Sequence, residues 1–156
     1  DDVDPVPIAA AVRKPITFLM AQDQEKLPWY KAWGPWSYGA LLVNRESVQI
    51  STIKKIQQQI IKKEIVCIFP EGTIKGRGLK KGKRGVAYFA IKNEIPIIPT
   101  AVMGTKGIIE KIKNLKREKV KIVFGNPIFV KKGDGEEEIT RRTMNSLREM
   151  LTADYL

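Results

Sequence analysis

The chain has 156 residues, a length that suits one domain with one sizeable core. Its 28 Lys and Arg against 17 Asp and Glu give a formal net charge of +11. Such an excess favours nucleic acid, anionic lipid or phosphorylated partners, although a lysine-rich source composition with solvated side chains explains the charge equally well. The sequence has no histidine and one cysteine, Cys67, which excludes an internal disulfide and makes a structural zinc site unexpected. It also excludes Ser-His-Asp and Cys-His catalysis built from these residues alone.

Membrane-spanning and secretory patterns are missing from the sequence. No run reaches the roughly 18 to 20 apolar residues that a spanning helix needs. The first four residues, DDVD, lack the basic start and apolar core of a signal peptide. We therefore expect a chain that is soluble or lies on a membrane without crossing it.

Short apolar runs alternate with helical patterns along the chain, which predicts an α/β fold with a single domain. We expect a mixed, mostly parallel sheet flanked by helices. The predicted helices and strands, in chain order, are a helix at 5–12, strands at 16–20 and 39–43, a helix at 47–63, a strand at 65–69, a helix at 85–92, strands at 95–102 and 120–124, and a helix from about 136 to about 153.

Several of these elements carry a more detailed expectation. The β-branched run 65–69 is typical of a strand covered on both faces, and Lys121 with Asn126-Pro127 places the last strand near a sheet edge. Asp134 is the expected N-cap of the last helix, whose acidic first turn suits the positive helix end. Periodicity predicts a buried stripe on the first long helix, formed by Ile50, Ile53, Ile56, Ile60 and Ile61, and one on the last helix, formed by Ile139, Thr143, Leu147, Met150 and Leu151.

The segment Phe69-Pro70-Glu71-Gly72-Thr73 is the strongest candidate for a functional site. It follows an apolar strand, and α/β folds place ligands at the carboxyl ends of strands. Pro70 stops the strand ladder, and Gly72 allows a ligand to approach the backbone. Glu71 can orient a base or accept a hydroxyl proton, and Thr73 offers a hydroxyl. Taken by itself, the segment also fits an ordinary strand-to-loop turn.

A basic, glycine-rich loop follows this segment. Its combination of flexible backbone and dense positive charge suits a phosphate or an acidic carrier, whereas the alternative is a solvated mobile loop. It is not a Walker A loop, because the G-x-x-x-x-G-K-[ST] pattern is missing. The basic residues, with no acid among them, are Lys75, Arg77, Lys80, Lys81, Lys83 and Arg84.

Four segments taken in order resemble the 1-acylglycerol-3-phosphate acyltransferase family of glycerolipid acyltransferases. GALLVNR at 39–45 resembles its second block, which ends in a phosphate-binding arginine, here Arg45. FPEGT at 69–73 resembles the third block and IPIIP at 95–99 the fourth, with GKRGVAYFA at 82–90 matching the helix between them. The resemblance covers nearly the whole chain, 1–156, as one acyltransferase domain with that family's α/β fold.

The family's first block, N-H-x-x-x-x-D, is matched in part. Asp4 fits its aspartate, so the catalytic histidine would fall two residues before Asp1. The resemblance thus implies that this histidine and the family's N-terminal membrane helix precede the given sequence. Two other departures are Ile74-Lys75 where the third block continues Arg-Ser, and Gln22 where a lysine is usual.

The resemblance implies an acyl transfer from acyl-CoA or acyl carrier protein to the sn-2 hydroxyl of lysophosphatidic acid, which makes phosphatidic acid. Asp4 would orient the histidine that takes the hydroxyl proton. Arg45 would hold the acceptor phosphate, for which a surface charge after a strand is the structural alternative. Glu71 would share the catalytic site, and no metal or cofactor is implied. The substrate-binding residues would be Arg45, Phe69, Pro70, Gly72 and Thr73.

The substrate of such an enzyme lies in a bilayer, so we expect a membrane surface carrying anionic lipid as a partner, on the cytoplasmic face and in bacteria at the inner membrane. An aromatic cluster suits the membrane interface, with a core or a lid over the acyl chain as the alternative. A second basic stretch at 111–119 could add contacts with anionic lipid. The aromatic residues are Trp29, Tyr30, Trp33, Trp36 and Tyr38.

Three other functions stay open at this point. A nucleic-acid-binding module is permitted by the charge, but we expect no nucleic-acid partner because the basic residues do not accompany an RNP-type strand or a zinc pattern. A catalytically inactive lipid-binding relative is possible if Asp1 is the true start. Within enzymes, the acceptor could be another lysophospholipid or an ornithine lipid.

Overall fold

The computed structural model describes residues 4–21, 41–43, 50–71, 79, 81–105 and 119–152. Several predictions lie outside these residues: Arg45, Gly72 and Thr73, the aromatic cluster at 29–38, and much of both basic stretches. The described helices and strands follow one another as α1 (Pro5–Val12), β1 (Ile16–Ala21), β2 (Leu41–Val43), α3 (Ile50–Ile61), β3 (Ile65–Cys67), α4 (Gly85–Asn93), β4 (Thr100–Met103), β5 (Lys121–Phe124) and α6 (Glu136–Thr152).

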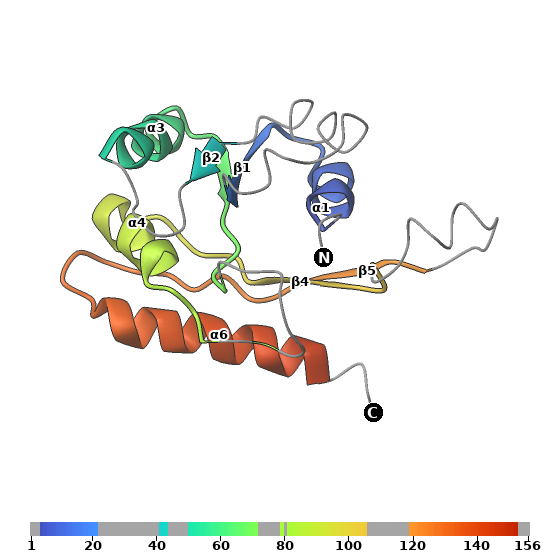
Figure 1. The fold of residues 1–156 in the computed structure, drawn as a ribbon. Coiled ribbons are helices and arrows are strands. Elements are labelled where there is room, and N and C mark those ends of the chain that lie inside the picture. Colours follow the sequence, from blue (N-terminus) through green and yellow to red (C-terminus); the bar gives the residue numbers. More distant parts are fainter. Residues whose placement is uncertain are drawn as a thin grey trace.

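These elements form the predicted α/β fold, with the strands in two ladders (Figure 1). A three-stranded parallel sheet has the order β2-β1-β3, in which β1 pairs with β3 through its first half and with β2 through its second half. The chain therefore passes from β1 to β2 on one side and then to β3 on the other. The carboxyl ends of all three strands lie at one edge of this sheet, because the strands are parallel.

The second ladder is an antiparallel pair, β4 with β5. Ile97 and Ile128 extend it as an isolated bridge, with hydrogen bonds of 3.0 and 2.8 Å between their backbones. β4 begins at Thr100, later than predicted, since Pro96 and Pro99 lack the N–H group that a ladder needs. Among the described strands β5 pairs with β4 alone, and Lys121 is exposed, as expected near an edge.

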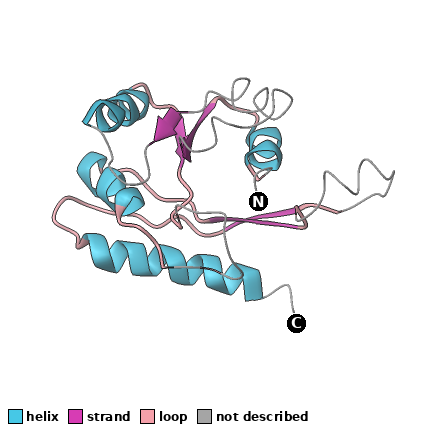
Figure 2. Ribbon diagram, viewed as in Figure 1, coloured by secondary structure: helices cyan, strands magenta, loops and turns pink. Residues whose placement is uncertain are grey.

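Helix α6 runs along the β4–β5 pair and contacts β4 and α4 (Figure 2). Its buried residues Ile139, Thr143 and Leu147 confirm the predicted stripe, to which Met144 is added. The N-cap prediction is wrong. The carbonyl of Gly135 accepts the first helical hydrogen bond from Ile139 at 3.0 Å, while the Asp134 carboxylate accepts one from the backbone of Lys131 at 2.9 Å.

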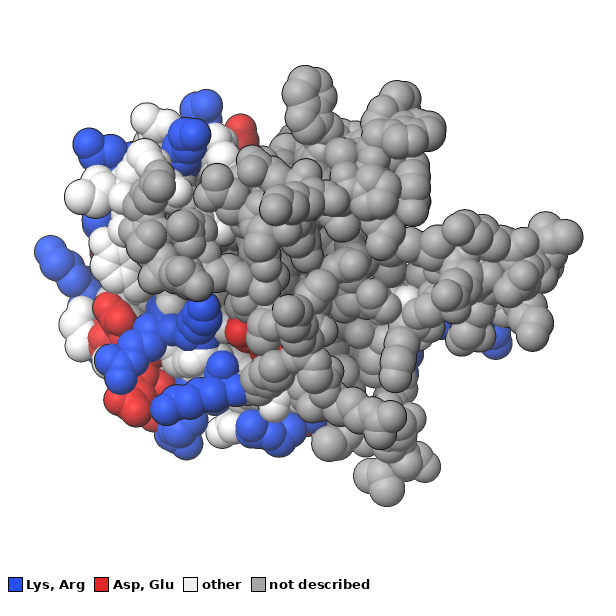
Figure 3. All heavy atoms as spheres, in the orientation of Figure 1, with Lys and Arg blue, Asp and Glu red and all other residues white. Residues whose placement is uncertain are grey.

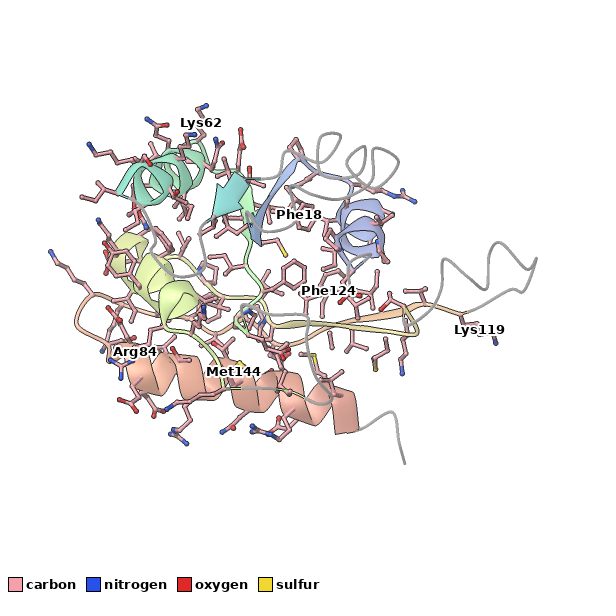
Figure 4. All side chains as sticks on the ribbon, viewed as in Figure 1. Phe18, Lys62, Arg84, Lys119, Phe124 and Met144 are labelled. Carbon is pink, nitrogen blue, oxygen red and sulfur yellow. The ribbon has the colours of Figure 1, made fainter. Side chains whose placement is uncertain are left out.

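The core beneath the parallel sheet joins segments that are distant in the sequence. Ile8 of α1 packs with Ile16 and Phe18 of β1. Cys67, Phe69 and Val102 of β4 are among the partly buried residues around them. Figure 4 shows Phe18 between the parallel sheet and the β4–β5 pair. One apolar cluster therefore fixes α1, β1, β4 and the chain after β3 relative to each other.

Two expectations about burial are wrong. Helix α3 ends at Ile61, two residues earlier than predicted, and contacts the three-residue strands β2 and β3. Its buried side chains are Thr52 and Ile56, whereas Ile50 and Ile61, at the two helix ends, are 72% and 70% exposed. β3 is an outer strand of its sheet, and its cover is incomplete: Ile65 is exposed, while Val66 and Cys67 are half-buried.

Candidate active site

Asp4 lies immediately before α1 but does not cap it, since its side chain makes no capping hydrogen bond. Its Oδ1 instead accepts a hydrogen bond of 2.6 Å from the hydroxyl of Thr105, which is 101 residues away in the sequence. Thr105 is buried and lies two residues after the end of β4. The Asp4 carboxylate is thus directed at the carboxyl end of β4.

The turn that presents Thr105 depends on a glycine. Gly104 has a φ of +84°, in the left-handed region that side chains rarely adopt. A Cβ atom at this position would lie 2.3 Å from the carbonyl oxygen of Lys119. The backbone therefore approaches the start of β5 too closely for any other residue.

Phe69, Pro70 and Glu71 are the described part of the third block. Phe69 packs against the cluster that also contains Ile8, one helical turn from Asp4 on α1. Residues four positions apart lie on the same side of a helix. The structure therefore brings the start of the third block and the amino end of α1 onto the same core. Gly72 and Thr73 lie outside the described residues.

The basic loop after the third block is closed at its base. The backbone N–H of Lys83 donates to the carbonyl of Pro70 at 2.8 Å, so the two ends of the loop meet. Gly82 lies against α6, where a Cβ atom would come within 2.7 Å of the Met144 side chain. This contact holds the far end of the loop on α6, and Figure 4 shows Met144 on that helix near Arg84.

At least one basic residue near this loop is paired with an acidic side chain of the same chain. Arg84 forms an ion pair with Glu137 of α6 at 3.2 Å, with both side chains largely exposed. Such surface pairs contribute little to stability. Figure 3 shows Lys and Arg over α3, and mixed with Asp and Glu around α4 and the start of α6. Arg84 therefore already has an acidic partner within the chain.

The ends of β2 and β3 have a specific place in this topology. The strand that follows β1 lies on one side of it and the next strand lies on the other, so the strand order reverses at β1. Open α/β sheets bind ligands at the carboxyl edge of such a switch point. β2 ends at Val43, two residues before Arg45 in the sequence, and β3 ends at Cys67, two residues before Phe69. The described strand ends therefore place the end of the second block and the start of the third near the same edge of the sheet.

A family model described as Acyltransferase matches residues 2–103, which include all four of the segments singled out above. The chain belongs to this family. The match covers Asp4 and extends to the last residue of β4, so the described site falls almost entirely within the family's own boundaries.

Relatives of this acyltransferase-family chain carry a common name. A 1-acyl-sn-glycerol-3-phosphate acyltransferase from Streptococcus pneumoniae is 32% identical over 81% of the chain and 46% of its own length. One of the same name from Salmonella typhimurium is 35% identical over 62% of the chain and 41% of its own length. The chain thus spans less than half the length of these curated relatives.

The crystal structure of a 1-acyl-sn-glycerophosphate acyltransferase, PlsC, from Thermotoga maritima has the same fold. It superposes with a TM-score of 0.65 at 18% identity, covering 95% of this chain and 60% of the other. The predicted glycerolipid acyltransferase-like α/β fold is confirmed. Thr105, which contacts Asp4, is a residue of the candidate site that sequence reasoning missed, although the glycine before it is a residue type that marks special turns.

Proposed function

We propose that the protein of which this chain is part transfers an acyl group from a thioester to the sn-2 hydroxyl of 1-acylglycerol-3-phosphate, forming phosphatidic acid. The observation that carries the proposal is the family match over residues 2–103, within which Phe69 of the third block packs on the same core as Ile8, four residues after Asp4. The shared name of the relatives supports the choice of substrate.

In the proposed reaction, a histidine two residues before Asp1 takes the proton from the acceptor hydroxyl. Asp4 orients the imidazole and stabilises its charged form. The hydroxyl oxygen attacks the thioester carbonyl, and the carbon–sulfur bond breaks. The proton returns from the imidazolium to the thiolate, so that an ester and a free thiol are the products.

The acceptor would be held by the second and third blocks. Arg45 would bind the phosphate through two parallel hydrogen bonds, which a planar guanidinium suits. Phe69, Pro70 and Glu71 would form the described wall of the acceptor site, and Gly72 and Thr73 would complete it. The order of the strand ends supports this arrangement, because β2 and β3 flank β1 at the edge where the second block ends and the third begins.

The lipid acceptor requires contact with a membrane surface. Among the described residues, no helix combines the length and hydropathy needed to span a bilayer. The formal charge of +11 favours a surface rich in anionic lipid, and we place the protein on the cytoplasmic face. The thioester donor, acyl-CoA or acyl carrier protein, is a soluble molecule of that compartment.

The test is an assay of thiol release by the full-length protein, with acyl-CoA and acyl carrier protein as alternative donors. We expect transfer to lysophosphatidic acid, and Asp4→Asn should lower kcat by roughly 10³- to 10⁴-fold because the imidazole loses its orienting carboxylate. Glu64→Gln, which neutralises an exposed carboxylate, is the matched control. Transfer to an ornithine lipid or to another lysophospholipid, but not to lysophosphatidic acid, would overturn the assignment of the acceptor.

A further inference from the structure

The hydrogen bond between Thr105 and Asp4 joins a buried hydroxyl to the carboxylate at the amino end of α1. The hydroxyl donates to Oδ1 over 2.6 Å, within the range of strong O–H···O⁻ hydrogen bonds. Thr105 is 6% exposed, so little water competes for its hydroxyl. The bond therefore constrains the orientation of the Asp4 side chain.

The backbone around Thr105 reinforces this constraint. Gly104 holds a positive φ and fits against the carbonyl of Lys119, which fixes the chain directly before Thr105. On the other side of the bond, Ile8 anchors α1 in the core that contains Val102 of β4. Both partners are thus held by packing that does not depend on the hydrogen bond itself.

We propose that Thr105 is a positioning residue for Asp4, and that it sets the rotation of the carboxylate toward the catalytic histidine. This inference rests on the proposed function. An ionised carboxylate has about four acceptor positions, so the hydroxyl takes one and an imidazole N–H can use another. By directing Oδ1, Thr105 would hold the imidazole in the geometry that proton transfer requires.

The experiment compares Thr105→Val, which removes the hydroxyl at constant shape, with Thr105→Ser, which keeps it, in the full-length protein. We expect Thr105→Val to lower kcat roughly 10- to 100-fold and to leave both KM values within about twofold, because orientation and not binding is lost. Thr105→Ser should stay near the wild type. Thr143→Val is the matched control, since it removes a buried hydroxyl that donates to a backbone carbonyl within α6.

A double mutant separates positioning from a structural role. If Thr105 acts through Asp4, adding Thr105→Val to Asp4→Asn should change kcat less than about twofold. Equal losses of kcat in the presence and absence of the Asp4 carboxylate would overturn the inference, as would a folded Thr105→Val enzyme with wild-type kcat. Should the valine variant fail to fold, Thr105→Ala removes the same hydroxyl and is judged by the same criteria.

The inference and the proposed function can fail separately. If the wild-type protein transfers acyl groups to lysophosphatidic acid and Thr105→Val leaves kcat unchanged, the inference alone is contradicted. A folded wild-type protein that transfers to no lysolipid contradicts both. A folded Thr105→Ser variant as impaired as the valine variant would show that keeping the hydroxyl does not preserve kcat, which also overturns the inference.

Discussion

Several residues of the candidate site form hydrogen bonds with partners that are distant in the sequence. Asp4 is directed by Thr105 across 101 positions, and Pro70 accepts a backbone hydrogen bond from the far end of the basic loop. The contact between Thr105 and Asp4 joins two side chains, so one substitution removes it. Predictions at this scale therefore concern individual functional groups.

Arg45 is predicted to bind the phosphate of the acceptor. Arg45→Ala in the full-length protein should raise the KM for lysophosphatidic acid roughly 10- to 100-fold, since hydrogen bonds to charged groups contribute about 1.5 to 3 kcal/mol. Steady-state kinetics with varied acceptor measure this change. Arg142→Ala, in an exposed part of α6, serves as the control, and an unchanged KM for the acceptor in Arg45→Ala would contradict the assignment.

The burial of Cys67 predicts how the free energy of unfolding depends on pH. Desolvation by burial raises the pKa of its thiol from 9.0 to about 12. The folded state keeps the thiol proton that the unfolded chain loses above pH 9, so this stabilisation is complete below pH 9 and is lost as the pH rises toward 12. Urea unfolding should show a free energy that falls over this window by up to about 1.4 kcal/mol per pH unit.

The matched variant for this effect is Cys67→Ala. It removes the thiol while leaving every lysine and tyrosine that titrates in the same window. The fall in unfolding free energy should become shallower in this variant. Identical slopes in the two proteins would show that Cys67 does not cause the pH dependence.

At the scale of elements, α3 shows that an apolar stripe need not be buried along its whole length. The strands below it are three residues long, so they cover its middle and leave Ile50 and Ile61 in solvent. Asn93 at the end of α4 contributes a further contact, because its side-chain amide donates to Gln57 of α3 at 3.2 Å. The helix is therefore held by its centre and by α4.

This arrangement predicts that Ile→Ala lowers the free energy of unfolding by different amounts at two positions of α3. Ile56 is 1% exposed, so Ile56→Ala should lower the free energy of unfolding by about 2 to 5 kcal/mol through lost burial and the cavity left behind. Ile61→Ala should change it by less than about 0.5 kcal/mol. Urea denaturation of both variants measures the difference, and equal losses would mean that the helix is buried as its periodicity alone predicted.

In the part of the chain that the structure describes, basic side chains are spread over several elements. Basic side chains lie over α3, whereas around α6 they alternate with acids, as in the pair between Arg84 and Glu137 (Figure 3). Long-range attraction depends on the summed charge, and it is screened within about 10 Å at 0.1 M salt. Binding to a charged surface is therefore a property of the complete chain.

We expect the protein to sediment with phosphatidylglycerol vesicles at low ionic strength and to be released as salt is added. The net charge of +11 provides the attraction, at about 1 kcal/mol for each basic residue near the surface. Phosphatidylcholine vesicles of equal size are the control. Binding that is equally strong to both lipids, or that does not change with salt, would contradict an electrostatic attachment.

Much of the local structure was predictable because its causes are local. Helix α1 has the predicted bounds, and α4 and α6 differ from prediction by about one residue at their ends, since 3.6-residue periodicity and proline positions act over a few neighbours. The expected strands are also present: β1 is one residue longer than predicted, and β3, β4 and β5 are shorter. The motifs at 39–45, 69–73 and 95–99 likewise identified the family from their order in the chain.

The sequence by itself therefore determined the α/β class, the position of most elements and the family. Tertiary structure decided what these elements cover: it placed β3 at a sheet edge, exposed both ends of α3 and replaced Asp134 by Gly135 at the start of α6. It also joined Asp4 to Thr105. Burial and hydrogen bonds across 101 residues depend on how whole elements pack, and local sequence patterns carry no information about that packing.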